Sequence, residues 1–545
     1  MVSGLVVMML GAAAAMPCES LQSVKLDKAT ITSATLVPEG PMPARGGGAG
    51  GAARGAAGRG AGGPGAARGA GNEGVRGRGA APADAATGAR GAAPQAGRGQ
   101  QGPAVAAQPP QRLPAHCRVQ LVLKPSSDSH IEMEMWMPPA DAWNGKFMAV
   151  GNGGFAGSIQ GLTNEMPQAL RLGYATAGTD TGHQGGGGEW AIGHPEKLVD
   201  FAYRATHEMT VKAKKLVDAF YGRAPQFSYF RGCSTGGRMG VMAAQRYPDD
   251  YDGIIAGALA NRHIHMWTAG IERSVSLSRN PDRALTAEQA ALVNNLVMNA
   301  CDVHKEGFLT NPKACSVDVS SLRCKAGESG NSCLTDAQMK TVDTFYGGVK
   351  NSKGELIFSG QALGNPIGAQ RPTNASPGGT WDIVRIAYND PNRDWKTFDL
   401  DRDMKVLDDR IGYVDAVNPD LGRFKRSGGK LLLYHGWSDT GITPENTIWY
   451  YNRVLDKMGS RQDDWMRLFM VPGMGHCGGG PGVNTFDSIS ALEAWVEKGV
   501  APTVLTGTGA QGMTRPLCAY PQAPEYNGTG DIKDGRNWSC KAPAK

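Results

Sequence analysis

A strand, a glycine-bounded turn and a helix follow one another without a break between residues 227 and 246 of this 545-residue chain. The run Phe227–Arg231 is rich in aromatic residues, and the turn Gly232-Cys-Ser-Thr-Gly236 bends sharply because glycine stands at both of its ends. A helix is predicted over 237–246. A buried strand that leads directly into a helix is typical of a sheet with helices packed on its faces, so the chain is predicted to have an α/β fold.

The same alternation recurs on both sides of this segment. Short apolar runs or period-two patterns predict strands, and apolar residues three and four positions apart predict helices. The strands are expected at 117–124, 131–137, 146–150, 174–177, 430–434 and 466–471, and the helices at 198–220, 444–457 and 484–498. This alternation indicates a mostly parallel sheet that is covered by helices on both faces.

Composition divides the chain into segments. Residues 39–113 are rich in Gly, Ala, Arg and Pro, and they have too few apolar side chains to offset the entropy of ordering, so a disordered insert is predicted there. Residues 259–427 show no strand alternation but contain two capping-box sequences, which predicts an inserted, mainly helical domain. The remaining segments, 18–38, 114–258 and 428–545, are expected to form the sheet domain.

The charge of the chain gives no support to a nucleic-acid-binding function. The formal net charge is +6, but residues 41–112 hold nine arginines against only Glu73 and Asp84, so the rest of the chain is nearly neutral. Arginine-glycine repeats can bind RNA, which is the alternative for this insert. After the N-terminus no apolar run of 18 residues occurs, so no membrane span is expected in the body of the chain.

The N-terminus and the cysteines indicate export. Residues 1–17 combine a short apolar region with a run of alanines, as in a secretory signal peptide, although the positive charge that usually precedes the apolar region is missing. A buried N-terminal helix is the alternative. The ten cysteines are even in number and lack zinc-binding C-x-x-C spacing, which favours disulfides in an oxidising compartment. We therefore expect a secreted or periplasmic protein.

A candidate catalytic triad can be assigned from motif and chain order. The turn Gly232–Gly236 matches the G-x-S-x-G nucleophile elbow, which makes Ser234 the candidate nucleophile. In an α/β-hydrolase fold the acid follows the serine in the chain and the histidine comes last. Asp439 follows the predicted strand 430–434, and His476 is the only histidine after it. The alternative is that Asp439 and His476 are ordinary loop residues.

Two cysteines flank this candidate triad. Cys233 directly precedes Ser234, and Cys477 directly follows His476. If the serine and the histidine lie within hydrogen-bond reach, their neighbouring cysteines are placed to form a disulfide. Such a bond would hold the loop of the general base on the elbow.

Several motifs together resemble the tannase/feruloyl esterase family of α/β-hydrolases. The resemblance covers nearly all of 114–545 and implies a serine esterase with a Ser–Asp–His triad and a lid domain, here 259–427. It also implies oxyanion donors at the backbone N–H of Thr235 and at a glycine of the pair Gly153-Gly154. The motifs are 143–147, 151–155, 232–237, 245–253, 475–477 and 515–521 with Cys540, and the implied further disulfides are Cys18–Cys117, Cys301–Cys315, Cys324–Cys333 and Cys518–Cys540.

The resemblance implies a small aromatic ester as substrate. Members of the family cleave aromatic carboxylic esters, so we expect feruloyl, hydroxycinnamoyl or galloyl esters to be hydrolysed through an acyl-enzyme. One alternative is an aromatic monoester such as mono(2-hydroxyethyl) terephthalate, and another is a non-catalytic binding scaffold. Trp381 and Phe398 are candidates to clamp an aromatic acyl group, and the favoured alternative is that each is a core residue of the lid. The sequence does not predict an oligomeric state.

No cofactor is expected. The lid of this family usually carries a calcium loop, but the corresponding stretch here, 301–309, is shortened and contains Lys305. Asp302 and Glu306 are the only candidate ligands, and two carboxylates are too few for a calcium ion that takes six to eight oxygens. We therefore expect no bound calcium.

Overall fold

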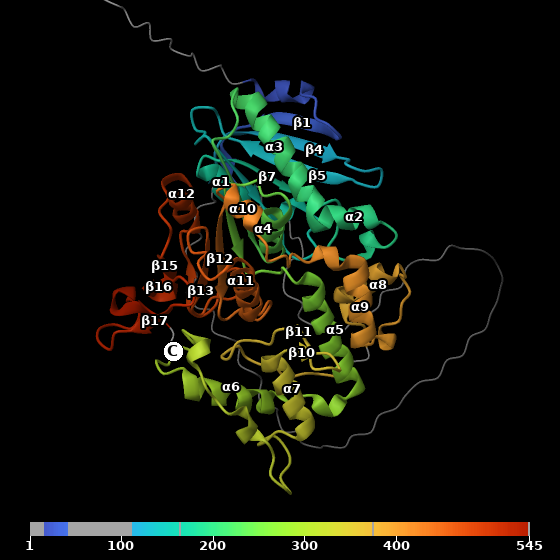
Figure 1. Ribbon diagram of the computed structural model, residues 1–545, viewed down its shortest axis with the longest axis vertical. Helices are drawn as coiled ribbons and strands as arrows, with labels where there is room; N and C mark the ends of the chain where they lie inside the picture. The colour runs from blue at the N-terminus through green and yellow to red at the C-terminus, as the bar shows by residue number, and fades with distance from the viewer. Residues whose placement is uncertain (1–15, 42–111, 163–164, 373–374, 543–545) are drawn as a thin grey trace, which may run out of the picture. The chain divides into compact units, whose positions relative to one another are not determined.

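The computed structural model describes residues 16–41, 112–162, 165–372 and 375–542 (Figure 1). Nearly all of the predicted signal peptide and residues 42–111 of the predicted insert lie outside these ranges. The two ends of the insert are described and are paired, because β2 (Gly40–Pro41) is antiparallel to β3 (Arg112–Leu113). The predicted boundaries of the insert, 39–113, are therefore too wide by a few residues on each side.

A nine-stranded sheet organises the chain. From β7 to β13 the strands are parallel, whereas β1, β4 and β5 extend the sheet by antiparallel pairing. The fold prediction of a mostly parallel sheet is confirmed, and the early segment 18–38 contributes its edge strand. In spatial order the strands are β1 (Ala29–Val37), β4 (His116–Leu123), β5 (Ile131–Met137), β7 (Ala175–Thr179), β6 (Lys146–Val150), β8 (Phe227–Cys233), β9 (Gly253–Gly257), β12 (Lys430–Gly436) and β13 (Met466–Val471).

Helices cover both faces of this sheet. Along β12, Leu431 and Leu433 pack into the cluster beneath one face, while Leu432 between them packs into the cluster on the other face. This division follows from the alternation of side chains along a strand. The first face is covered by α3 (Ala205–Tyr221), α4 (Thr235–Arg246) and α11 (Pro444–Met458), and the second by α1 (Glu165–Arg171) and α12 (Ser488–Lys498).

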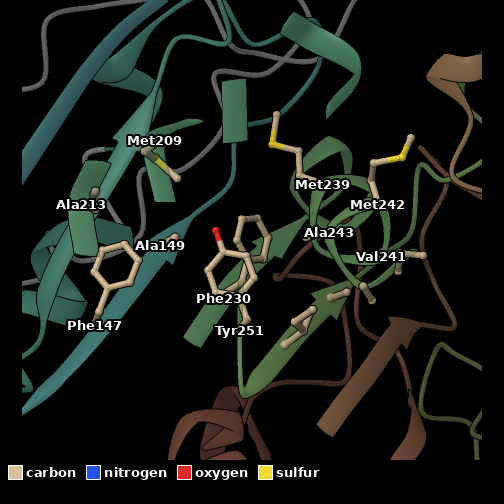
Figure 2. Close-up of a cluster of buried hydrophobic side chains, with 14 of the residues drawn as sticks. Phe147, Ala149, Met209, Ala213, Phe230, Met239, Val241, Met242, Ala243 and Tyr251 are labelled. Carbon is tan, nitrogen blue, oxygen red and sulfur yellow. The ribbon is translucent and has the colours of Figure 1, made fainter. Parts of the chain in front are cut away.

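Figure 2 shows how the first face is packed around β8. Phe230 of β8 lies beside Phe147 and Ala149 of β6, and the helices contribute Met209 and Met239 to the same cluster. All five side chains are at most 3% exposed. Burial of this size holds the strand that carries the elbow rigidly between its helices, which is what a preorganised site requires.

The inserted segment, residues 259–427, leaves the sheet after β9 and returns at β12, the neighbouring strand. Both predicted capping boxes are formed, Thr286 with Gln289 and Thr335 with Gln338. A two-stranded hairpin within the segment was not predicted, because its strands are very short. The segment contains α5 (His263–Arg279), α6 (Ala287–Cys301), α7 (Asp336–Gly347), β10 (Val349–Lys350), β11 (Leu356–Phe358), α8 (Asp382–Tyr388), α9 (Leu400–Ile411) and α10 (Gly422–Arg426).

Five disulfides pair all ten cysteines, and the C-terminal region adds small sheets next to the main one. The bonds are the linking disulfide and the four that the family resemblance implies. Within the described ranges, no helix is long and apolar enough to cross a membrane. The disulfides are Cys18–Cys117, Cys233–Cys477, Cys301–Cys315, Cys324–Cys333 and Cys518–Cys540. The strands of the small C-terminal sheets are β14 (Val483–Thr485), β15 (Val504–Gly509), β16 (Thr514–Cys518), β17 (Ala523–Tyr526) and β18 (Trp538–Lys541).

Candidate active site

Ser234 stands at the sharp turn between β8 and α4. Its backbone has φ 64° and ψ −123°, a conformation that costs energy for any residue with a side chain. The surroundings hold it there, because the Ser234 N–H donates to the carbonyl of Gly257 at 3.0 Å. Gly232 must be glycine, since a Cβ at this position would lie 2.5 Å from the carbonyl group of Gly236. The elbow therefore presents the Ser234 side chain at the carboxyl edge of the sheet.

The two predicted oxyanion positions lie next to each other. Thr235 is the first residue of α4, so its backbone N–H has no acceptor within the helix. The Thr235 hydroxyl donates to the carbonyl of Gly154 at 2.6 Å, which fastens the glycine loop 151–157 to the start of the helix. The far end of this loop is also fixed, because the Gly157 N–H donates to the carbonyl of Asp180 at 3.1 Å.

Asp439 lies just after β12, and its side chain is fully buried. Its Oδ2 atom is 2.8 Å from Nδ1 of His476, and its Oδ1 atom accepts the backbone N–H groups of Gly441 and Ile442 at 2.8 and 2.9 Å. Burial alone would raise the pKa of Asp439, but hydrogen bonds from His435 and His476 outweigh it and hold this pKa well below its usual range. The carboxyl is thus ionised at neutral pH.

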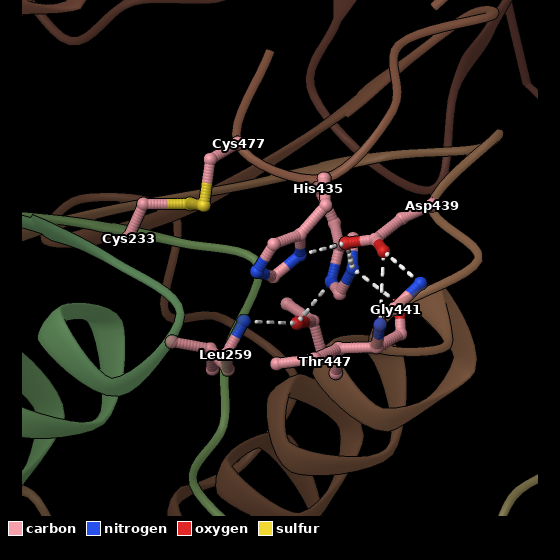
Figure 3. The surroundings of a disulfide bond; sticks show 9 residues. Cys233, Leu259, His435, Asp439, Gly441, Thr447 and Cys477 are labelled. Carbon is pink, nitrogen blue, oxygen red and sulfur yellow. Dashed lines mark hydrogen bonds and ion pairs between the residues drawn. A yellow bond between two sulfur atoms is a disulfide. The ribbon is translucent and has the colours of Figure 1, made fainter. Parts of the chain in front are cut away.

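His476 lies on the loop that follows β13. Its side chain is 38% exposed, and the hydrogen bond of Nδ1 to Asp439 leaves Nε2 free to take a proton from a nearby hydroxyl. The Cys233–Cys477 disulfide joins the residue before Ser234 to the residue after His476, with the two Cα atoms 5.9 Å apart (Figure 3). The structure therefore brings the three predicted triad residues to one place at the sheet edge.

Trp381 and Phe398 do not line this site. Each is 1% exposed, and their rings pack edge to face at 6.1 Å within the core of the inserted segment. The indole N–H of Trp381 donates to the carbonyl of Arg393, so its polar atom is also occupied. The prediction that they clamp a substrate is wrong, and the alternative of lid core residues holds.

Three other aromatic residues lie beside the glycine loop and were missed. Phe155 belongs to this loop, and its ring is 4.1 Å from the ring of Trp267 and 6.3 Å from that of Trp190. Both tryptophans are partly exposed, unlike Trp381. The position of Phe155 directly after Gly154 was a usable signal, whereas Trp190 and Trp267 come from distant parts of the chain. We call these three residues the aromatic wall.

The residues of 301–309 do not fit a calcium site. Both oxygens of Asp302 accept backbone N–H groups, those of Glu306 and Gly307, at 3.0 and 2.8 Å. The Glu306 carboxylate pairs with the buried guanidinium of Arg515, which also lies 3.8 Å over the ring of Trp538. No group of three potential metal ligands occurs in the described part of the chain. The carboxylates are thus occupied by donors of the protein itself.

A cavity of about 340 Å³ lies on the acid side of the site. It is bounded by Val297 and Met298 of α6 and by Ser438 and Thr440, which flank Asp439. Asn365 also lines it and donates to the backbone carbonyl of Asp439 at 3.2 Å. The inserted segment and the acid loop therefore meet around this space.

The sequence of the chain is similar to that of known esterases. The family model described as "Tannase and feruloyl esterase" matches residues 117–541. The chain is 34% identical over 456 residues to a probable feruloyl esterase B-2 of Aspergillus terreus, and 32% identical over 454 residues to a feruloyl esterase B of Aspergillus niger. Each alignment covers 78% of this chain and 86% of the relative.

Solved structures show the same similarity. The chain resembles feruloyl esterase B from Aspergillus oryzae with a TM-score of 0.75 and 28% identity, over 96% of this chain and 99% of that one. It shares its fold with a tannin acyl hydrolase from Aspergillus niger, with a TM-score of 0.66 and 23% identity, over 80% of this chain and 88% of that one. The predicted α/β fold agrees with these structures.

Proposed function

Because the chain belongs to the tannase and feruloyl esterase family and is a carboxylic ester hydrolase, we propose that it cleaves aromatic carboxylic esters with Ser234, Asp439 and His476 as its catalytic triad. Feruloyl, hydroxycinnamoyl or galloyl groups are the proposed acyl parts. The observation that carries this assignment is the pair of connections at His476, one through its ring to Asp439 and one through Cys477 to the elbow.

The proposed mechanism follows from this geometry. Nε2 of His476 takes the proton of the Ser234 hydroxyl as its oxygen attacks the ester carbonyl carbon. Asp439 holds the imidazole with its proton on Nδ1 and stabilises the imidazolium. The carbonyl oxygen becomes negative and accepts the N–H of Thr235 and an N–H of the Gly153-Gly154 pair. His476 then gives its proton to the departing alcohol, and water releases the acid from Ser234 by the same steps.

The aromatic wall supports an aromatic acyl group. Its rings lie beside the proposed oxyanion loop, where the acyl group of the bound ester must lie if its carbonyl oxygen reaches Thr235. Phe155 is buried, whereas Trp190 and Trp267 are partly exposed. Large, partly exposed aromatic side chains bind a planar aromatic group by stacking and by burial of apolar surface. The similar proteins of 28% identity or more reported above are feruloyl esterases, which does not favour the terephthalate monoester alternative.

We also propose that the protein works in a secreted or periplasmic setting. Its five disulfides need an oxidising compartment to form and persist. No calcium is required by the proposed mechanism, since no step passes through a metal ion.

Hydrolysis assays on esters with a common alcohol test this function. The purified protein is expected to cleave methyl ferulate or methyl gallate faster than methyl acetate, and Ser234→Ala is expected to reduce the rate to a few per cent or less at unchanged melting temperature. Activity retained in Ser234→Ala would show that another residue is the nucleophile. A higher kcat/KM for mono(2-hydroxyethyl) terephthalate than for all natural aryl esters would favour the alternative substrate.

A further inference from the structure

A second histidine contacts the carboxylate of Asp439. His435 is at the end of β12, and its side chain has no exposed surface. Its Nε2 atom lies 3.0 Å from Oδ2 of Asp439 and 3.0 Å from the carbonyl of Ile442 (Figure 3). Oδ2 is the same oxygen that accepts from His476, so one carboxylate oxygen is shared by two imidazoles.

The partners of His435 define where its proton lies. Nε2 faces a carboxylate and a carbonyl, which only accept hydrogen bonds, so Nε2 carries a hydrogen. Nδ1 is 2.7 Å from the hydroxyl of Thr447, and that hydroxyl already accepts the backbone N–H of Leu259 at 3.3 Å. In a neutral ring with its hydrogen on Nε2, Nδ1 can only accept, so the hydroxyl donates its own hydrogen to Nδ1. Every polar atom of this chain of contacts is satisfied in this one arrangement, as buried groups require.

Hydrogen bonds occupy both oxygens of the Asp439 carboxylate. Oδ1 accepts from Gly441 and Ile442, and Oδ2 accepts from His435 and His476. Of these four donors, only His476 belongs to the proposed triad as a proton carrier. Removing His435 would leave Oδ2 with one donor and a buried charge partly unsatisfied, which costs free energy and loosens the orientation of the carboxyl plane.

We propose that His435 is a positioning residue of this esterase: it holds Oδ2 of Asp439 where His476 uses it and, through Thr447, ties the acid to Leu259, the first residue of the inserted segment. This inference rests on the proposed triad. His435 does not touch the reacting atoms, so its effect passes through Asp439. The coupling to Leu259 links the acid to the point where the chain leaves the sheet.

Two substitutions at one position separate positioning from packing. His435→Leu removes the three hydrogen bonds of the ring, to Asp439, Ile442 and Thr447. His435→Gln instead places an amide N–H₂ near the position of Nε2, where it can donate to Asp439 and to Ile442. We expect His435→Leu to lower kcat by about 10- to 100-fold with little change in KM, because a small displacement of the base is costly. His435→Gln is expected to recover most of this loss. Equal kcat values for the two variants would overturn the proposal.

The pH profile gives a second readout. Without His435, Oδ2 of Asp439 is held less firmly against His476 and stabilises its imidazolium less, so the acidic limb of kcat/KM against pH is expected to move to lower pH in His435→Leu. A role in packing alone would lower the melting temperature and leave this limb in place. An unshifted limb together with kcat above half of the wild-type value would contradict the proposal.

Substitutions of Thr447 test the link to Leu259 and remain informative if His435→Leu fails to fold. Thr447→Val removes the hydroxyl at nearly constant volume and should lower kcat, whereas Thr447→Ser keeps the hydroxyl and should preserve it. The double variant His435→Leu/Thr447→Val should be no slower than His435→Leu, because both changes break one chain of contacts. Independent, multiplying losses, or equal rates for Thr447→Val and Thr447→Ser, would refute the link. A wild-type protein inactive on every aryl ester would instead refute the proposed function.

Discussion

Cys233 and Cys477 are joined across 244 residues of sequence, and each is the immediate neighbour of a residue that must exchange a proton in the proposed mechanism. The bond connects the elbow after β8 to the loop after β13, two strands separated in the sheet by β9 and β12. The side chain of His476 is 38% exposed, and a hydrogen bond of its ring to Asp439 orients it. The disulfide thus supplies a covalent constraint at the place where the geometry matters most.

Breaking the Cys233–Cys477 disulfide should lower kcat as well as the stability of the protein, and the loss of kcat should exceed what partial unfolding would cause. Cys233→Ala or Cys477→Ala is expected to lower kcat by about 100-fold, since a displacement of about 1 Å is enough for such a loss. Stability should also fall by about 5.5 kcal/mol on the chain-entropy account of a loop this long. The matched control is Cys518→Ala/Cys540→Ala in the C-terminal region, which should keep most of kcat. Free thiols at Cys233 and Cys477 in fully active protein would contradict this expectation.

The aromatic wall should control acyl specificity. Trp267→Ala is expected to lower kcat/KM for a feruloyl ester about tenfold more than for an acetyl ester of the same alcohol, because the lost surface contacts only the larger acyl group. Phe398→Leu, a change in the core of the inserted segment, should lower the melting temperature without changing this ratio. The two ratios can be measured with one pair of substrates, and an unchanged ratio in Trp267→Ala would exclude the wall from the acyl site.

Chelation of divalent cations should leave the protein unchanged. We expect EDTA to alter neither the melting temperature nor the rate, because Glu306 is paired with the buried Arg515. Glu306→Gln should instead lower the free energy of unfolding by about 3 kcal/mol, since it leaves a buried guanidinium without its counter-charge. Glu525→Gln, an exposed change on β17, serves as the control. A fall in melting temperature on adding EDTA that calcium reverses would show a metal site.

One buried carboxyl should make stability depend on pH. Burial raises the pKa of Asp180 to about 7, against the hydrogen bonds from Gly182 and Glu132, which lower it. A folded-state pKa above the unfolded value means that folding favours the protonated form, so this contribution to stability is present below about pH 4 and is lost as pH rises through 7. Asp180→Asn should therefore lose less stability than the wild type between pH 5 and 8 in urea unfolding. The exposed Asp282→Asn should follow the wild type, and parallel curves for Asp180→Asn would contradict the prediction.

Removal of residues 42–111 should change little. The segment has too few apolar residues to join a core, and Pro41 and Arg112 are paired neighbours in β2 and β3, so a two-residue Asn-Gly turn can connect them. The rate on a small aryl ester and the melting temperature of the shortened protein are expected to match those of the full chain. A clear loss of either quantity would show that the segment packs against the rest of the chain or controls access to the site.

Local patterns in the sequence were sufficient for most strands of the main sheet, for the elbow and for the order of the proposed triad. The turn at Ser234 needs glycine at Gly232 because of contacts within a few residues, so the motif is visible in the chain itself. Chain order then selected His476, since no other histidine follows Asp439. The strand β9 was missed because a run of three apolar residues between glycines carries too little periodicity to be recognised.

Tertiary structure alone decided which aromatic residues lie beside the glycine loop and how the acid is held. Trp381 and Trp267 are the same residue type in the same inserted segment, yet one is buried in its core and the other stacks beside the glycine loop. His435 is four residues from Asp439, but its proposed role depends on Thr447 of α11 and on Leu259, which lies just after β9. Burial and hydrogen-bond partners are set by packing between distant segments, and the spacing of residues along one segment does not contain that information.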